Sequence, residues 1–242
     1  MKELWNRLLF YLSVPKCVSC KGRLSYGDAA LCPYCAERYS ELKLDRCTEC
    51  TRLLSECDCA PTYLRSHFVS RLIKVFRYRN EEERLAANAL IYSLKRDNRR
   101  DVLSFLAAEV SSAIRNSVKI PENLVVTNIP RRRSAIVKYG IDHAALFAKE
   151  VAKELGAEYL DILKSSSKRA QKKLTNEQRR LNVDYSVKRE LDLAGKKVML
   201  IDDIVTTGTS MGSAATLLRG LGAKGIIGVC IAIAYRDKNN FE

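Results

Sequence analysis

The chain has 242 residues, of which 47% are hydrophobic, enough for a packed core and too many for a disordered chain. Its 42 Lys and Arg residues outnumber its 28 Asp and Glu residues, which gives a formal net charge of +14. No run of about 18 apolar residues occurs, so the sequence predicts no membrane span. The excess positive charge favours phosphate-bearing ligands or a polyanionic partner, with a solubilising surface as the alternative.

A short apolar stretch at residues 8–14 comes first. It contains Tyr11 and Ser13 and is followed by Pro15 and Lys16 rather than by a small-residue cleavage site. We therefore expect a packed segment rather than a secretory signal.

Eight of the nine cysteines fall in the next segment as closely spaced pairs. They are Cys17 and Cys20, Cys32 and Cys35, Cys47 and Cys50, and Cys57 and Cys59. A Cys-x-x-Cys turn places two sulfurs on one side of a knuckle, and two knuckles supply the four thiolates that a tetrahedral zinc ion prefers. We predict a double zinc ribbon in which the metals replace a core, because four-cysteine sites are closed and structural.

Two alternatives stay open at these cysteines. A disulfide framework needs an oxidising compartment, and the missing signal makes zinc the favoured interpretation. The pairs can share zinc ions in sequential order or in an interleaved, cross-braced order. The pair Cys57 and Cys59 has one residue too few for the usual knuckle, so the second site has the weaker pattern. The ninth cysteine, Cys230, lies in an apolar run and is expected to be a buried strand residue.

After residue 60, helical and strand patterns alternate. Helices are expected from residue 80 to about residue 94, over residues 102–114, and over residues 143–155 with an end at Gly156. Strands are expected at residues 124–127, 197–201 and 226–233. The pattern predicts an α/β fold with a mainly parallel sheet flanked by helices. We divide the chain into residues 1–60, the cysteine-rich module, and residues 61–242.

Residues 198–210 are the most informative stretch for function. A buried strand ends in Asp202 and Asp203, and a polar loop follows before a helix near residue 210. The residues of that loop are Thr206, Thr207, Gly208, Thr209 and Ser210. Hydroxyls and backbone N–H groups at a helix start can cradle a phosphate, which a glycine allows to come close. Two acids beside a phosphate need a neutral or metal-bearing partner, and sugar hydroxyls meet that need.

This stretch resembles the phosphoribosyl pyrophosphate motif of type I phosphoribosyltransferases. The resemblance implies that Asp202 and Asp203 hold the ribose hydroxyls, that the loop holds the 5′-phosphate, and that Mg²⁺ bridges ribose and pyrophosphate oxygens. It also implies that a pyrophosphate loop contains Arg131, Arg132 and Arg133. Position 206 is threonine, where purine-salvage members carry an acid, and residue 2 is lysine rather than the catalytic cysteine of an amidotransferase.

The cysteine module together with this motif is similar to the ComF family of competence-associated, phosphoribosyltransferase-like proteins. Leu94-Lys95 and residues 171–183 match the family's Leu-Lys and Gln-x-x-Leu, Arg-Arg, Asn-Val elements. Two elements depart from the family pattern: residues 127–130 replace Val-Pro-Val-Pro, and residues 139–143 replace Arg-Gly-Phe-Asn-Gln. Neither His67 nor His143 is assigned a role, and no catalytic residue is identified.

Seven basic residues and one acid lie between Lys164 and Arg180. We expect a lid over the ligand there, which can also contact nucleic acid. The residues assigned to it are Gln171, Lys172, Lys173, Arg179 and Arg180. Arginines at 77, 79, 96, 99 and 100 can follow a nucleic-acid backbone, and Phe76, Tyr78 and Tyr92 can stack on bases, although such aromatics are more often core.

Three functions compete. The resemblance implies a cytoplasmic protein that handles single-stranded DNA in natural transformation, with helicase and recombination proteins as partners. The first alternative is a metabolic phosphoribosyltransferase whose acceptor the sequence does not name, and binding without turnover is equally open. The second is a phosphoribosyl pyrophosphate-responsive regulator of duplex DNA, for which the sequence offers no helix-turn-helix.

Overall fold

The computed structural model describes residues 5, 13, 15–78, 85–97, 99–131, 133–165, 185–188 and 191–234. Some predictions concern residues outside these ranges and stay predictions. They concern most of the apolar stretch at residues 8–14, the helix start at residues 80–83, Arg79, Arg132, and the lid residues Gln171, Lys172, Lys173, Arg179 and Arg180.

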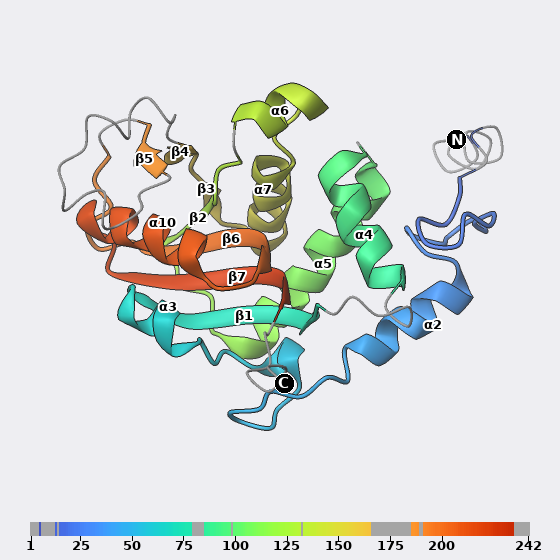
Figure 1. The fold of residues 1–242 in the computed structure, drawn as a ribbon, viewed down its shortest axis with the longest axis horizontal. Helices are drawn as coiled ribbons and strands as arrows, with labels where there is room; N and C mark the ends of the chain where they lie inside the picture. The colour runs from blue at the N-terminus through green and yellow to red at the C-terminus, as the bar shows by residue number, and fades with distance from the viewer. Residues whose placement is uncertain are drawn as a thin grey trace, which may run out of the picture.

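A five-stranded parallel sheet forms the centre of the protein (Figure 1). Its strands lie in the order β1, β7, β6, β2, β3. Their bounds are Val69–Arg77 for β1, Leu124–Asn128 for β2, Glu158–Tyr159 for β3, Lys197–Val205 for β6 and Gly225–Ile233 for β7. The three predicted strands are confirmed as β2, β6 and β7. β1 was not expected, because Arg71, Lys74 and Arg77 interrupt its apolar pattern.

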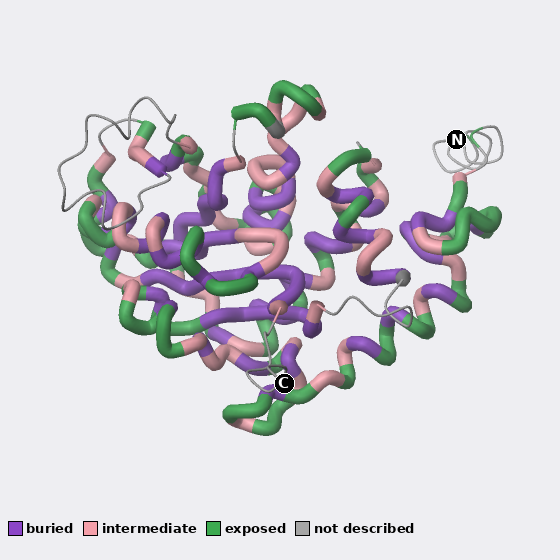
Figure 2. The backbone as a smooth tube through the Cα atoms, in the orientation of Figure 1, coloured by how far each residue is buried: buried purple, intermediate pink, exposed green. Residues whose placement is uncertain are grey.

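Different helices cover the two faces of the sheet. On β6, Met199 and Ile201 belong to one apolar core and Val198 and Leu200 to the other, as the alternation of a strand requires. The first core includes side chains of α4 (Leu85–Arg96), α5 (Arg100–Ser117) and α7 (His143–Leu155). The second includes side chains of α3 (Thr62–Ser66) and α10 (Thr209–Gly220). Figure 2 shows the central strands buried between these layers, which confirms the predicted α/β architecture.

The predicted helices agree with the structure to within a few residues. α7 begins after Asp142, whose side chain accepts a hydrogen bond from Ala145 N at 3.1 Å, and ends at Gly156 with φ of 65°. α5 extends the predicted helix at both ends. The short α6 (Arg133–Tyr139) precedes α7, and β4 (Leu163–Ser165) pairs antiparallel with β5 (Tyr185–Val187). Among the described helices, none has the length and apolar character needed to cross a membrane.

The cysteine-rich region packs directly against the sheet layer. It contains α2 (Pro33–Leu42) and the 3₁₀ turn η1 (Leu54–Glu56), which lie along α4, α5 and β1 in Figure 1. Tyr39 of α2 is buried, with its ring centroid 5.8 Å from that of Phe76 and 5.4 Å from that of Phe105. Lys43 Nζ lies 2.9 Å from a carboxylate oxygen of Glu109. These side chains form contacts across the predicted domain boundary between residues 60 and 61. That boundary stays a prediction about which residues fold as a unit.

Candidate functional site

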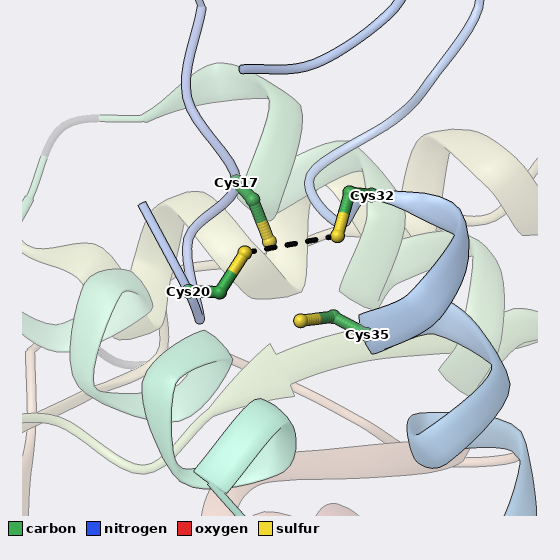
Figure 3. A group of neighbouring side chains, drawn as sticks. All are labelled: Cys17, Cys20, Cys32 and Cys35. Carbon is green, nitrogen blue, oxygen red and sulfur yellow. Dashed lines mark hydrogen bonds between the residues drawn. The ribbon is translucent and has the colours of Figure 1, made fainter. Parts of the chain in front are cut away.

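The eight paired cysteines form two clusters. Cys17, Cys20, Cys32 and Cys35 make the first cluster, and Cys47, Cys50, Cys57 and Cys59 make the second. Within each cluster the four sulfurs lie within 4.8 Å of one another. Figure 3 shows the four cysteine side chains of the first cluster gathered around one point. The pairs therefore come together in sequential order and are not cross-braced. The short pair Cys57 and Cys59 completes the second set.

The sulfur positions suit a metal and not a disulfide. The nine cysteines are free thiols, and the two sulfurs are 3.5 Å apart in Cys50 and Cys57 and 3.7 Å apart in Cys20 and Cys32. A disulfide needs a sulfur separation of about 2.05 Å. Four sulfurs at these separations match the ligand set of a tetrahedral site, so each cluster could bind a metal ion such as zinc.

Hydrogen bonds favour ionised sulfur at one cysteine of each cluster, Cys17 and Cys50, whereas burial raises the pKa of Cys35 and Cys59 to about 12 and that of Cys57 above the ordinary thiol value. Burial raises the pKa of Cys17, but the hydrogen bonds that backbone N–H groups donate to its sulfur outweigh burial. Together these effects lower the pKa to about 7. In the second cluster burial is likewise outweighed, by hydrogen bonds from Arg52, which lower the pKa of Cys50 to about 6. Backbone amides of Glu49 and Cys59 each donate to a cluster sulfur at 3.4 Å. A metal ligand must be a thiolate, so these donors fit metal binding.

Asp202 and Asp203 lie near the carboxyl end of the central strand β6. Asp203 forms ion pairs with Lys95 Nζ at 2.9 Å and with Arg131 at 3.3 Å. Asp202 Oδ1 accepts a hydrogen bond from the amide of Asp203 at 2.8 Å. Burial and the neighbouring charge of Asp203 raise the pKa of Asp202 well above the ordinary value of an aspartate. The two acids are therefore unequal: one is paired with cations, and the other favours a proton.

The polar loop after β6 leads directly into α10. Gly208 is buried at the helix start with φ of +80°, a conformation that favours glycine. A Cβ atom there would meet Leu64 of α3 at 3.0 Å, so a larger residue lacks room as well. The hydroxyls of Thr207 and Thr209 lie 2.9 Å apart and are exposed. The amide of Thr209 donates to the hydroxyl of Thr207 at 3.4 Å, whereas Gly208 at the cap position has no side chain to accept from the later N–H groups of the first turn.

A pocket of about 580 Å³ joins these parts. Its lining residues are Tyr92, Lys95, Arg96, Ile129, Pro130, Arg131, Ser134, Tyr139, Ala144, Tyr185, Asp202, Asp203 and Ser210. The volume is in the range of small-molecule sites. Three cations, two acids and the start of α10 therefore face one space at the carboxyl end of a parallel sheet, where ligands bind in such folds.

Comparison with known proteins agrees with this arrangement. The family model "Phosphoribosyl transferase domain" matches residues 140–240. Competence protein F of Haemophilus influenzae is 24% identical, over 87% of this chain and 93% of its own length. DNA utilization protein YhgH of Escherichia coli K12 is 24% identical, over 91% of this chain and 98% of its own length. These similarities, together with the cysteine clusters, fit a ComF-like protein.

Among proteins of known structure, the allosteric regulatory enzyme of purine biosynthesis is 20% identical with a TM-score of 0.42, and the match covers 58% of this chain and 30% of that chain. An adenine phosphoribosyltransferase is 19% identical with a TM-score of 0.36, over 57% of this chain and 69% of its own.

The structure brings together some of the predicted site residues of this chain and separates others. Asp202, Asp203, Ser210 and Arg131 line the pocket. Thr206, Thr207 and Thr209 are exposed beside it, and Arg133 is exposed at the start of α6 and does not line it. The roles of all these residues stay predictions.

Several lining residues were not predicted as site residues. Lys95 was visible only as half of a Leu-Lys element with no assigned role, and Tyr139 only as a departure from the ComF pattern. Both line the pocket because α4 and α6 end beside the carboxyl edge of the sheet. Tyr92 was named only as an aromatic that can stack on bases, and Tyr185 and Ser134 carried no sequence signal.

The two histidines have local partners or are buried. His67 Nδ1 lies 2.8 Å from the carbonyl oxygen of Tyr63. The His67 ring also stacks on the Tyr63 ring. His143 is 5% exposed, and burial followed by the charge of Arg131 lowers its pKa. Neither observation assigns a catalytic role.

Two residues that were expected to contact nucleic acid are buried and cannot reach it. Phe76 is buried in the core, and Arg77 is buried and donates to the carbonyl oxygen of Arg46 at 3.3 Å. Both belong to β1, a sheet strand that the sequence did not reveal. Tyr92 is different, since it is 55% exposed and lines the pocket.

Proposed function

We propose that this ComF-like protein binds phosphoribosyl pyrophosphate in the pocket at the carboxyl end of β6. The observation that carries the proposal is the meeting of Asp202 and Asp203 with Lys95, Arg131 and the start of α10 in one space of ligand size. Acids alone would repel a pyrophosphate, and cations alone would offer no acceptors for the hydroxyls of a ribose. The combination suits a ligand that carries hydroxyls and phosphates together.

Each part of the ligand has a group of suitable chemistry. Asp202 and Asp203 accept hydrogen bonds from the ribose hydroxyls, and residues 206–210 hold the 5′-phosphate through hydroxyl and backbone N–H groups. Arg131, with the predicted Arg132 and Arg133, faces the pyrophosphate, whose departure needs positive charge. Bound Mg²⁺ would neutralise part of the phosphate charge, and Asp202 and Asp203 supply the carboxylate oxygens that it prefers.

Titration calorimetry with and without Mg²⁺ tests this site. The wild type should bind saturably, and the double variant Asp202→Asn, Asp203→Asn should lose at least about tenfold in affinity, which is 1.4 kcal/mol. Asp161→Asn is a matched control, because Asp161 pairs with Lys188 and does not line the pocket. Undiminished binding by the double variant would refute the assignment.

We infer that zinc is the metal of both cysteine clusters and that it stabilises residues 1–60 as a module distinct from residues 61–242. The sequential sulfur sets and their hydrogen-bond donors support this inference. Elemental analysis should find about two zinc ions per chain, one for each closed four-cysteine site. A metal-free protein that retains its fold would contradict it.

We propose further that the protein acts in the cytoplasm on single-stranded DNA taken up in natural transformation, with helicase and recombination proteins as partners. The names of its relatives, Competence protein F and DNA utilization protein, support a role in DNA use. The net charge of +14 suits a polyanion. At the pocket mouth, Arg96 lies over the exposed Tyr92 ring at 4.5 Å, a pairing of cation and aromatic face that suits a phosphate and a stacked base.

The DNA proposal has a matched internal control. Tyr34 and Arg38 on α2 repeat the spacing and the contact of Tyr92 and Arg96, with 5.7 Å from guanidinium to ring, and they lie away from the pocket. Tyr92→Ala should weaken binding of labelled single-stranded DNA by about 1–3 kcal/mol, and Tyr34→Ala should leave it unchanged. Equal losses in both variants would point to a diffuse charged surface instead.

Salt and the predicted lid give a second test of DNA binding. Affinity should fall with salt at a log–log slope of roughly −0.7 per phosphate contact. Charge reversal at Lys172, Lys173, Arg179 and Arg180 should weaken binding and flatten this slope. A slope near zero in the wild type would refute backbone recognition.

A metabolic phosphoribosyltransferase is the second candidate. Tyr92, Tyr139 and Tyr185 line the pocket and offer faces on which a planar acceptor can stack. Acceleration of pyrophosphate release by a base or an amine would favour this enzyme, whereas saturable binding without release would favour a ligand-binding role.

A further inference from the structure

A buried lysine lies against the second cysteine cluster. Lys74 of β1 is 1% exposed, although lysine is almost never fully buried without a partner. Its Nζ lies 2.7 Å from the carbonyl oxygen of Cys59, 3.1 Å from that of Leu72 and 3.3 Å from Cys57 Sγ. These three acceptors match the three N–H donors of an ammonium group.

The negative charge that a buried ammonium needs is found in the cluster. Within the described residues, no carboxylate forms an ion pair with Lys74, and the nearby Asp58 is paired with Arg52 and Arg71. Two of the three acceptors are neutral carbonyls. The remaining acceptor is the sulfur of Cys57, and a buried cation without an anion is strongly destabilising. The sulfur of Cys57 is therefore the one group among these three acceptors that can carry the balancing negative charge.

The first cluster has no equivalent lysine among the described residues. Lys21 lies beside it in sequence, but its Nζ donates to the carbonyl oxygen of Val18 at 2.9 Å. Arg99 acts on Cys17 through its charge and forms its side-chain hydrogen bonds with Asp101. The second cluster thus has a buried lysine contact that the first lacks, besides the hydrogen bond of Arg52 to Cys50, and this lysine comes from a strand of the sheet.

We propose that Lys74 is the counter-cation of the second metal centre, a positioning residue supplied by the sheet and not by the cysteine-rich region. Four thiolates on one divalent metal ion carry a net charge of −2, and the ammonium offsets one unit of it. The proposal rests on the inferred zinc binding. It makes the second centre part of the sheet edge, since Lys74 lies opposite Cys230 in the pairing of β1 with β7.

Two substitutions separate charge from hydrogen bonding. Lys74→Met removes the charge at similar length, and Lys74→Gln also removes it but keeps N–H donors for the two carbonyls. Lys21→Met is the matched control beside the first cluster. The full-length, zinc-loaded proteins are challenged with a chelator, and the alkylation rate of each cysteine is followed by mass spectrometry.

Both Lys74 variants should expose the second cluster to alkylation about tenfold faster than the wild type, the usual loss for an outer-shell partner. The first cluster should react at the wild-type rate, and Lys21→Met should change neither cluster. Wild-type rates at both clusters in both Lys74 variants would overturn the proposal. Equal acceleration at both clusters would also overturn it, because it would indicate general unfolding. A wild type that holds no zinc would instead defeat the zinc inference itself.

Discussion

The cysteine clusters and the charged pocket use ionic groups in opposite ways. In the clusters the sulfurs face one another, Cys17 and Cys57 are fully buried, and four ligands leave no room for a substrate. In the pocket, Lys95 and Arg131 each form an ion pair with Asp203. All three side chains nevertheless border a space of about 580 Å³. Changes in the clusters should therefore alter stability, and changes in the pocket should alter ligand binding.

The largest effect is expected from the loss of a cluster ligand. Cys57→Ser should lower the free energy of unfolding by at least about 3 kcal/mol, because a structural metal site loses a ligand. Cys230→Ala is a control at a buried cysteine outside the clusters and should cost about 1 kcal/mol. Urea unfolding measures both. Equal costs would mean that the clusters add nothing beyond burial.

A change at the start of α10 should affect both stability and the pocket. Gly208→Val places a branched side chain at φ of +80° and against Leu64, so a loss of about 1–3 kcal/mol is expected. Phosphoribosyl pyrophosphate affinity, measured by calorimetry, should fall with it. Gly220→Ala is the control at the other end of the helix, where a Cβ meets nothing within 4 Å, and it should be neutral or slightly stabilising. Undiminished affinity in Gly208→Val would show that the loop does not bind the phosphate.

Asp202 should make stability depend on pH in the opposite direction to a salt-bridged acid. Its pKa is raised by burial and by Asp203, so above the ordinary aspartate range the folded protein holds a proton that the unfolded chain has lost. Stability therefore falls as pH rises through that window. Asp202→Asn should be more stable than the wild type at neutral pH, and the difference should disappear below the ordinary pKa of aspartate.

The neighbouring acid gives the contrasting control. Asp203→Asn breaks the ion pairs with Lys95 and Arg131, so it should lower stability at neutral pH. Urea unfolding of both variants from about pH 3 to about pH 8 distinguishes them. If both variants changed the free energy of unfolding at neutral pH in the same direction, the two acids would not differ in the way proposed.

The smallest effect is expected where the cysteine-rich region meets α5. Lys43 and Glu109 are partly exposed, with 33% and 21% of their side-chain areas accessible, so Lys43→Met should cost less than about 1 kcal/mol. Lys153→Met is the control at a more exposed pair, Lys153 with Glu150, and should cost still less. Thermal unfolding checks both. A loss of several kcal/mol in Lys43→Met would mean that this contact joins the two regions far more tightly than an ion pair of its exposure can.

Local patterns predicted the elements that carry a strong periodic signal. The helix α7 was located to the residue because its apolar positions recur at helical spacing and Gly156 ends it. β6 and β7 were found because strands covered on both faces read as apolar runs. β1 was missed for the converse reason. Its Lys74 is buried by bonds to Cys57 and Cys59, partners that a periodicity argument does not consider.

The sequence by itself determined the acid pair, the polar loop and the eight cysteines, because each is a run of residues whose chemistry depends on close spacing. Tertiary structure alone decided that the cysteine pairs combine sequentially, that Lys95 of α4 pairs with Asp203 of β6, and that Tyr92 and Tyr139 share a pocket. The pocket residues among these are far apart in the chain and meet where separate elements end at the carboxyl edge of the sheet. Spacing along the chain fixes local chemistry, whereas packing of the layers fixes which distant side chains meet.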